Sequence, residues 1–165
     1  MIKQITSTHF HFAILLLSLL SMIFAYVVEY VFLILPCPLC IYQRFPYLLL
    51  IMLSIIGLQY KSQLLYRYYL ATITFAILIA FYHSGVERGM FEISRLCKPV
   101  VTILDDISID EFKKMLEAIK PAMCNRPEVV IFGLSMAEWN LLLNIMLFTI
   151  VNILKFKFRK NASSA

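Results

Sequence analysis

Two long apolar runs meet at Pro36-Cys37-Pro38-Leu39-Cys40-Ile41-Tyr42-Gln43-Arg44. This stretch holds a C-x-x-C pair in a short turn, where the two cysteines can close a disulfide. If the chain is helical from Ile41 onward, Cys40 lies near a helix N-terminus, with Arg44 one turn along on the same face. The partial positive charge of the helix end and the guanidinium both favour the thiolate, which is the form that attacks disulfides.

A C-x-x-C pair has other interpretations. It can be half of a zinc site or an inert loop disulfide, or it can occur by chance. The surroundings favour reactivity, because an arginine inside an apolar helix is costly and usually serves a function. We therefore interpret Cys37 and Cys40 as a redox-active pair.

The composition is that of an integral membrane protein. Of the 165 residues, 61% are hydrophobic and 15% are charged, and the mean hydropathy is +0.82. A soluble domain would be about half apolar and about a quarter charged. The net charge of +5 comes from basic residues scattered between apolar segments. These form no basic domain, so a nucleic-acid partner is not expected.

Four apolar segments are long enough to cross a bilayer, at about residues 12–34, 39–58, 64–83 and 137–154. The first is expected to be retained rather than cleaved as a signal peptide, because the run is long and no A-x-A-like site follows it. The second contains Pro46, which a membrane helix tolerates when neighbouring groups satisfy the freed backbone. The pattern predicts a single all-α membrane domain over residues 1–165, a bundle of four transmembrane helices.

Charge is distributed unevenly between the two ends of these segments. The N-terminus, the turn at residues 59–67 and the C-terminal tail carry no acidic residue but hold Lys3, Lys61, Arg67, Lys155, Lys157, Arg159 and Lys160. By the positive-inside rule both termini are cytoplasmic. The four cysteines then lie at the opposite face, which in a bacterium is the periplasmic side of the inner membrane, where disulfides persist.

The second loop on that side, about residues 85–136, is the only hydrophilic part large enough to meet a soluble partner. It contains Cys97 and Cys124. Between them, Ser108 and Glu111 fit a capping box, apolar residues recur at helical spacing, and Lys120 precedes a proline. This predicts a short amphipathic helix, either lying on the membrane surface or packing against the ends of the spans.

His83 lies where the third span meets this loop. It is a candidate proton donor, or a hydrogen-bond donor to a cofactor. A lone histidine at such a place can equally be a polar interface residue, and the sequence leaves both readings open.

Three blocks carry a family resemblance: residues 36–44, Tyr82-His83-Ser84-Gly85-Val86-Glu87 and Gly133-Leu134-Ser135-Met136-Ala137-Glu138-Trp139-Asn140. Together with the four spans and the separated second cysteine pair, they resemble the bacterial disulfide-bond formation protein B family, DsbB, over nearly the whole chain. The resemblance implies a membrane quinone reductase, using ubiquinone or menaquinone. Such an enzyme reoxidises a soluble periplasmic thioredoxin-fold thiol oxidase, DsbA-like, that inserts disulfides into exported proteins.

By position, Cys37 and Cys40 resemble the family's quinone-proximal pair, with Cys40 as the sulfur that faces the quinone. The resemblance implies that Arg44 and His83 lie beside the quinone ring as cofactor-binding residues. It implies no metal ligand in this chain.

The loop cysteines also have counterparts in the family. Cys97 resembles the sulfur that the partner attacks, and Cys124 resembles its mate. Electrons would then pass from the partner to Cys97–Cys124, next to the first pair, and finally to quinone. The chain departs from the family pattern at Glu29, at Asn125 and at residues 129–130, which concerns loop contacts more than chemistry.

Two other classes of protein fit the pattern. One is a vitamin K epoxide reductase-like enzyme, which is also a small helical bundle with four redox cysteines. The other is a non-enzymatic membrane scaffold whose cysteines form structural disulfides or a metal site. Four cysteines allow three pairings, and the sequence does not choose among them.

Overall fold

The computed structural model describes residues 2–60, 64–92, 97, 123–127 and 129–163, with side chains from residue 8 to residue 155 within these ranges. The amphipathic helix expected at residues 108–120 lies outside the described residues. Cys97 and Cys124 are both described.

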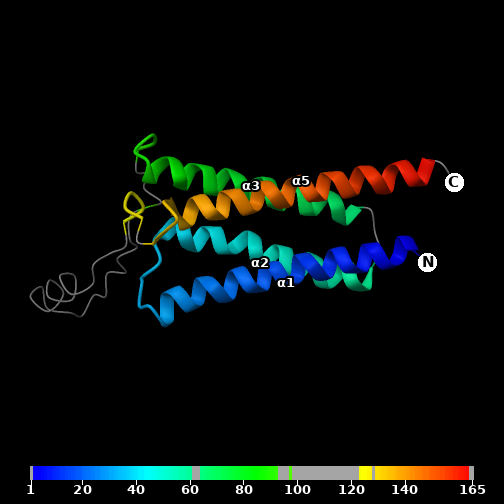
Figure 1. The fold of residues 1–165 in the computed structure, drawn as a ribbon, viewed down its shortest axis with the longest axis horizontal. Helices are drawn as coiled ribbons and strands as arrows, with labels where there is room; N and C mark the ends of the chain where they lie inside the picture. Colours follow the sequence, from blue (N-terminus) through cyan, green and yellow to red (C-terminus); the bar gives the residue numbers. More distant parts are fainter. Residues whose placement is uncertain (1, 61–63, 93–96, 98–122, 128, 164–165) are drawn as a thin grey trace, which may run out of the picture.

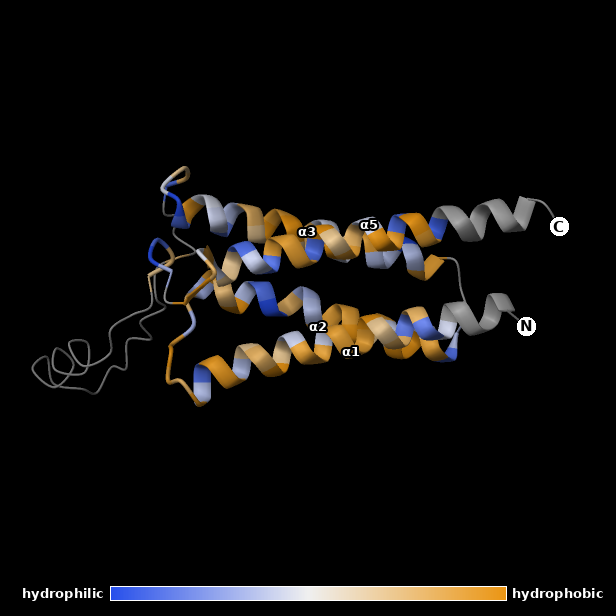
Figure 2. Cartoon of the chain, viewed as in Figure 1, coloured by the Kyte–Doolittle hydropathy of each residue, from blue (hydrophilic) through white to orange (hydrophobic). Residues whose placement is uncertain are grey.

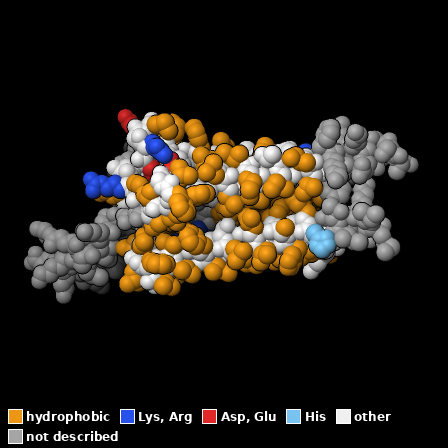
Figure 3. All heavy atoms as spheres, viewed as in Figure 1, with side chains coloured by type: hydrophobic (Ala, Val, Ile, Leu, Met, Phe, Trp, Pro, Cys, Tyr) orange, Lys and Arg blue, Asp and Glu red, His pale blue; other side chains and the backbone are white. Residues whose placement is uncertain are grey.

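The described part of the chain contains four long helices: α1 (Ile2–Tyr30), α2 (Pro38–Gln59), α3 (Leu64–Glu87) and α5 (Met136–Ser163). Each contains a segment long and apolar enough to cross a membrane, and apolar residues line their length (Figure 2). Hydrophobic side chains also cover most of the flank seen in Figure 3. The predicted four-helix membrane bundle is confirmed, and the protein is a multi-pass membrane protein.

The helices run side by side along the long axis of the molecule (Figure 1). Helix α1 packs on α2, α2 on α3, and α3 on α5. Both termini lie at one end, and the connections that carry the cysteines lie at the other. The bundle therefore has two chemically distinct ends.

The start of α2 is set by Pro38, its first residue. Helix α1 ends at Tyr30, four residues before the expected end of the first span, and Leu33 follows with a positive φ of 55°. Because Pro38 disfavours a helical residue before it, Cys37 is extended and caps α2. The Cys40 N–H donates to Cys37 Sγ at 3.2 Å. The helix thus begins at Pro38, earlier than Ile41, and Cys40 lies in its first turn.

A short hairpin precedes α5 and was not expected from the sequence. Strand β1 (Val130–Ile131) pairs antiparallel with β2 (Leu134–Ser135). The turn residues Phe132 and Gly133 have φ of 53° and 79°, as a type I′ turn requires. Ser135 then caps α5, because the Glu138 N–H donates to Ser135 Oγ at 3.2 Å and the Ser135 N–H donates to Glu138 Oε2 at 2.9 Å.

Near the termini, a buried histidine joins three helices. His11 Nδ1 lies 3.0 Å from the Tyr69 hydroxyl, which donates to Ser54 Oγ at 3.2 Å. The His11 ring also stacks on Tyr69, with ring centroids 5.6 Å apart. Gly57 of α2 lies against the same ring, where an added Cβ would be 2.5 Å from His11 Nδ1. Helices α1 and α2 can approach this closely because residue 57 has no side chain.

We expect Gly57→Ala to destabilise the bundle by about 1–3 kcal/mol, because the stacked His11 ring has no room to move. Thermal unfolding of the purified protein in detergent measures the effect. His11→Ala removes the obstructing ring, so the double variant should lose less stability than the sum of the two single changes. Additive losses would contradict the proposed contact.

Candidate functional site

All four cysteines gather at the end of the bundle opposite the termini. Cys37, Cys97 and Cys124 are buried in one cluster with Leu39 and Val86, and the half-buried Cys40 packs against it. Residues separated by up to 87 positions in the chain therefore meet at one place. The sequence predicted two pairs, and the fold brings the pairs together.

The first pair is held at the N-terminus of α2. All four cysteines are present as thiols, and the Cys37 thiol donates to Cys40 Sγ at 2.8 Å. This hydrogen bond, followed by burial, raises the pKa of Cys37 well above its ordinary value. Cys37 therefore keeps its proton, and the hydrogen bond that Cys40 accepts favours negative charge on its sulfur.

Cys124 connects the two pairs. Its side chain interacts with the side chains of both Cys97 and Cys37. Burial is the main reason that the pKa of Cys124 is raised. The loop pair thus touches the first pair through Cys124 and Cys37.

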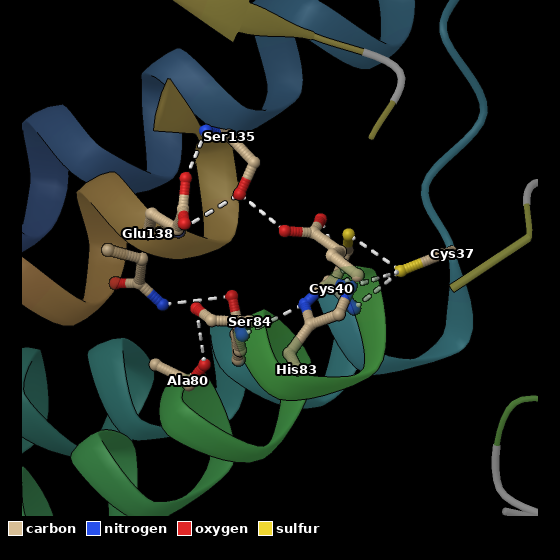
Figure 4. A network of polar contacts seen from close by, with 10 residues as sticks. Cys37, Cys40, Ala80, His83, Ser84, Ser135 and Glu138 are labelled. Atoms are coloured by element: carbon tan, nitrogen blue, oxygen red, sulfur yellow. Dashed lines mark hydrogen bonds and ion pairs between the residues drawn. The ribbon is translucent and has the colours of Figure 1, made fainter. Parts of the chain in front are cut away.

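His83 lies between the cysteines and two polar side chains (Figure 4). Its Nε2 atom is 3.4 Å from Cys37 Sγ and 3.6 Å from Glu87 Oε1, while its Nδ1 atom is 3.0 Å from Gln43 Nε2. The ring is only 1% exposed. Glu87 also accepts a hydrogen bond from the Ser135 hydroxyl. His83 is thus buried against the cysteine cluster.

A cavity of about 590 Å³ adjoins this cluster. Its walls are mostly apolar and come from α1, α2, α5 and the hairpin, with Cys40, Arg44 and His83 among the polar groups that face it. Phe24 and Leu142 also line it and are 49% and 48% exposed. The cavity therefore reaches the apolar flank of the bundle between α1 and α5.

Arg44 is paired with α1. Its Nη1 atom is 2.5 Å from Glu29 Oε2, and its guanidinium lies 5.0 Å from the centre of the Tyr26 ring. Side-chain exposures of 16% for Arg44 and 19% for Glu29 make this a half-buried ion pair. The sequence placed Arg44 near Cys40, but it did not predict that Glu29 neutralises the guanidinium.

The sequence pattern missed several polar residues of the site. Gln43 of α2 and Asn140 and Asn144 of α5 are buried or half-buried and form hydrogen bonds with one another or with His83. The half-buried Glu87 of α3 has a carboxylate oxygen 3.6 Å from His83 Nε2. Their signal was available, because polar side chains inside membrane segments are uncommon and usually have a partner.

A soft metal ion is chemically compatible with part of the cluster. Within the described residues, Cys37 Sγ, Cys40 Sγ and a His83 ring nitrogen lie within 4.8 Å of one another. Zinc prefers such sulfur and nitrogen ligands, but binds a histidine only through an unprotonated nitrogen. Whether His83 can act as a ligand depends on its tautomer.

Comparison with known proteins assigns the family. Residues 7–154 match the model of the family described as disulfide bond formation protein DsbB. The chain is also 37% identical over 147 residues to an uncharacterised protein of Rickettsia prowazekii (strain Madrid E), covering 88% of this chain and 86% of that protein. No solved structure matches. The chain belongs to the DsbB family, so it is a membrane protein of disulfide-bond formation and a disulfide oxidoreductase.

We expect Cys40→Ala to shift alkylation of Cys37 to lower pH. The substitution removes the acceptor of the Cys37 hydrogen bond, so the pKa of Cys37 falls toward its ordinary value and the thiolate forms earlier. Rates of N-ethylmaleimide modification, measured by peptide mass spectrometry from pH 6 to pH 10, report the shift. Cys40→Ser keeps an acceptor at this position and should leave the onset high. Identical profiles for the two variants would contradict this account of Cys37.

Proposed function

We propose that the protein is a quinone reductase of the bacterial inner membrane that reoxidises a soluble, DsbA-like thiol oxidase of the thioredoxin fold. The main observation that supports this proposal is the position of Cys124, which interacts with both Cys97 and Cys37. For electrons to pass between two cysteine pairs, a sulfur of one pair must lie within reach of a sulfur of the other pair. This contact meets that need.

The proposed electron path starts at the loop pair. The reduced partner gives two electrons to the Cys97–Cys124 disulfide, which becomes two thiols. The Cys124 thiolate then attacks Cys37, and the Cys37–Cys40 bond breaks with its electron pair on Cys40. Next, Cys97 attacks Cys124, which closes the loop disulfide and releases Cys37. Two electrons have now moved from one pair to the other, and the thiol protons balance the charge.

The cavity beside Cys40 fits a quinone. Pockets of roughly 300–1,000 Å³ with apolar walls and a few polar groups are typical of cofactor sites. In this cavity, Cys40 would face the ring and Arg44 would bind one of its oxygens, with His83 beside them. Bound quinone, either ubiquinone or menaquinone, supplies the acceptor for two electrons and two protons as Cys37 and Cys40 return to a disulfide.

Orientation follows from charge. The end of the bundle that holds both termini has the chain segments with basic and no acidic residues, among them Arg67 and Lys155, which supports a cytoplasmic location for that end. The cysteine end would then face the periplasm, where the soluble partner is found. The lateral position of the cavity supports entry of quinone from the lipid phase.

Cys97 is the proposed site of attack by the partner. It is only 6% exposed in the cluster, so the proposal requires that it leave this position when the partner binds. Cys124 is next to Cys37 and is therefore better placed to pass electrons inward.

A coupled assay tests the proposed function directly. Purified protein in detergent should reduce a soluble quinone only when a reduced thioredoxin-fold oxidase is supplied. Serine at position 37, 40, 97 or 124 should abolish turnover. A scaffold with structural disulfides predicts no quinone reduction by the unmodified protein.

We expect Cys124→Ser to accumulate a mixed disulfide between Cys97 and the reactive cysteine of the partner. The variant lacks the thiol that would release the partner from Cys97. Mass spectrometry of the non-reduced complex identifies the linked peptides. Cys97→Ser is the matched control and should trap nothing at position 97. A partner attached to Cys37 or Cys40 instead would show that the relay runs differently.

We expect Arg44→Ala to raise the apparent quinone KM roughly tenfold or more, because it removes a charged donor from the proposed site. The change also leaves Glu29 without its partner. The double variant Arg44→Ala/Glu29→Gln removes that unpaired charge, so it separates the loss of the donor from the burial of a free carboxylate. If the double variant has the unmodified KM, Arg44 serves only to pair with Glu29.

A further inference from the structure

A directional chain of hydrogen bonds leads from α5 to His83. It starts at the backbone carbonyl of Asn140, which can only accept. Asn144 Nδ2 donates to this carbonyl at 2.8 Å and also to Asn140 Oδ1 at 2.9 Å. The amide of Asn144 is therefore fixed in one orientation. Since Asn140 Oδ1 also accepts from the Tyr47 hydroxyl, the amide of Asn140 is fixed as well.

The chain continues through Gln43 to the histidine. Asn140 Nδ2 donates to Gln43 Oε1 at 2.9 Å, which leaves Gln43 Nε2 as the donor to His83 Nδ1 at 3.0 Å. A ring nitrogen that accepts a hydrogen bond carries no proton, so the proton of neutral His83 is on Nε2. That nitrogen faces Cys37 Sγ and Glu87 Oε1, and both can accept.

We propose that Gln43 and Asn140, anchored by Asn144, are positioning residues that fix the proton of His83 on Nε2. His83 is then a neutral hydrogen-bond donor to Cys37, and neither a base nor a metal ligand through Nε2. To reverse the donor and acceptor roles along this chain, the amides of Gln43, Asn140 and Asn144 would all have to turn. The Asn144 Oδ1 atom would then face the Asn140 carbonyl oxygen, and both atoms are acceptors.

The consequence for the relay rests on the proposed function. When Cys97 attacks the Cys124–Cys37 disulfide, the Cys97–Cys124 bond forms and the electron pair of the broken bond stays on Cys37. The Nε2–H of His83 is aimed at this sulfur and stabilises the thiolate as it leaves. Cys97 loses its proton to solvent before it attacks, and Cys37 takes up a proton after it leaves. The number of bound protons is therefore unchanged by this step.

Nitrogen NMR tests the tautomer without quinone or partner, so its outcome is independent of the proposed function. The chain has three histidines, and His83→Asn identifies the signals of His83 in protein labelled with ¹⁵N-histidine. The reduced protein should show a protonated Nε2 and an unprotonated Nδ1. Equimolar Zn²⁺ should leave both signals unchanged. A protonated Nδ1, or a zinc-induced shift of the Nε2 signal, would overturn the proposal.

Gln43→Glu replaces the amide donor that faces His83 with an acceptor, while it keeps the shape of the side chain. Its carboxylate accepts from Asn140 and from His83, so the His83 proton should move to Nδ1 and leave Nε2 without a proton. Transfer of electrons from the loop pair to the first pair should slow roughly ten- to a hundredfold, as expected for loss of a hydrogen bond to a charged group. Stopped-flow mixing followed by acid quench and thiol mass labelling measures this step.

Asn152→Leu is the matched control. It removes an asparagine from the same helix whose Nδ2 donates to the Phe148 carbonyl and which takes no part in the chain to His83. Its His83 spectrum and its transfer rate should match those of the unmodified protein. If Gln43→Glu also leaves the His83 spectrum unchanged, Gln43 does not set the tautomer.

Discussion

A polar group buried among membrane-spanning helices has no water to bond, and this constraint shapes the whole cysteine end of the protein. Each unsatisfied group in hydrocarbon costs several kcal/mol. The amides of Gln43, Asn140 and Asn144 therefore bond to one another, and Arg44 bonds to Glu29. Because these contacts join α2 to α5 and α1 to α2, the polar partners help determine how α1, α2 and α5 meet around the cavity.

The fold class was predictable because the signal is collective. Four apolar segments of sufficient length dictate four membrane helices, whatever the contacts between them, and one end of the bundle is marked by basic residues without acidic ones. The ends of the helices were less predictable. Apolar residues continue past Tyr30 to Leu35, so hydropathy alone extends the first span, whereas the positive φ at Leu33 and the prolines that follow end the helix earlier. The hairpin has only two residues per strand, too few for an alternating pattern.

The site was predictable in its chemistry and not in its contacts. The C-x-x-C pair, Arg44 and His83 could be selected because each residue type is unusual where it occurs. Which groups they touch depends on helix packing, which one sequence does not specify. Glu29 lies 15 positions before Arg44, and Asn140 lies 97 positions after Gln43. Only the assembled bundle shows that Glu29 neutralises Arg44 and that Asn140 bonds to Gln43, which contacts His83.

Cys37 has to meet two requirements at once. As the cap of α2, its sulfur accepts from the Cys40 N–H and so satisfies a backbone donor at the helix start. In the proposed relay, the same sulfur changes between thiol and disulfide. The two roles are compatible because a sulfur keeps its lone pairs in both states and remains a weak acceptor. The pair can thus be oxidised and reduced without loss of the cap, and α2 keeps Gln43 and Arg44 in place throughout. For the proposed relay, a site built on a helix terminus in this way would let electrons pass through the cysteines while Gln43 and Arg44 keep their positions.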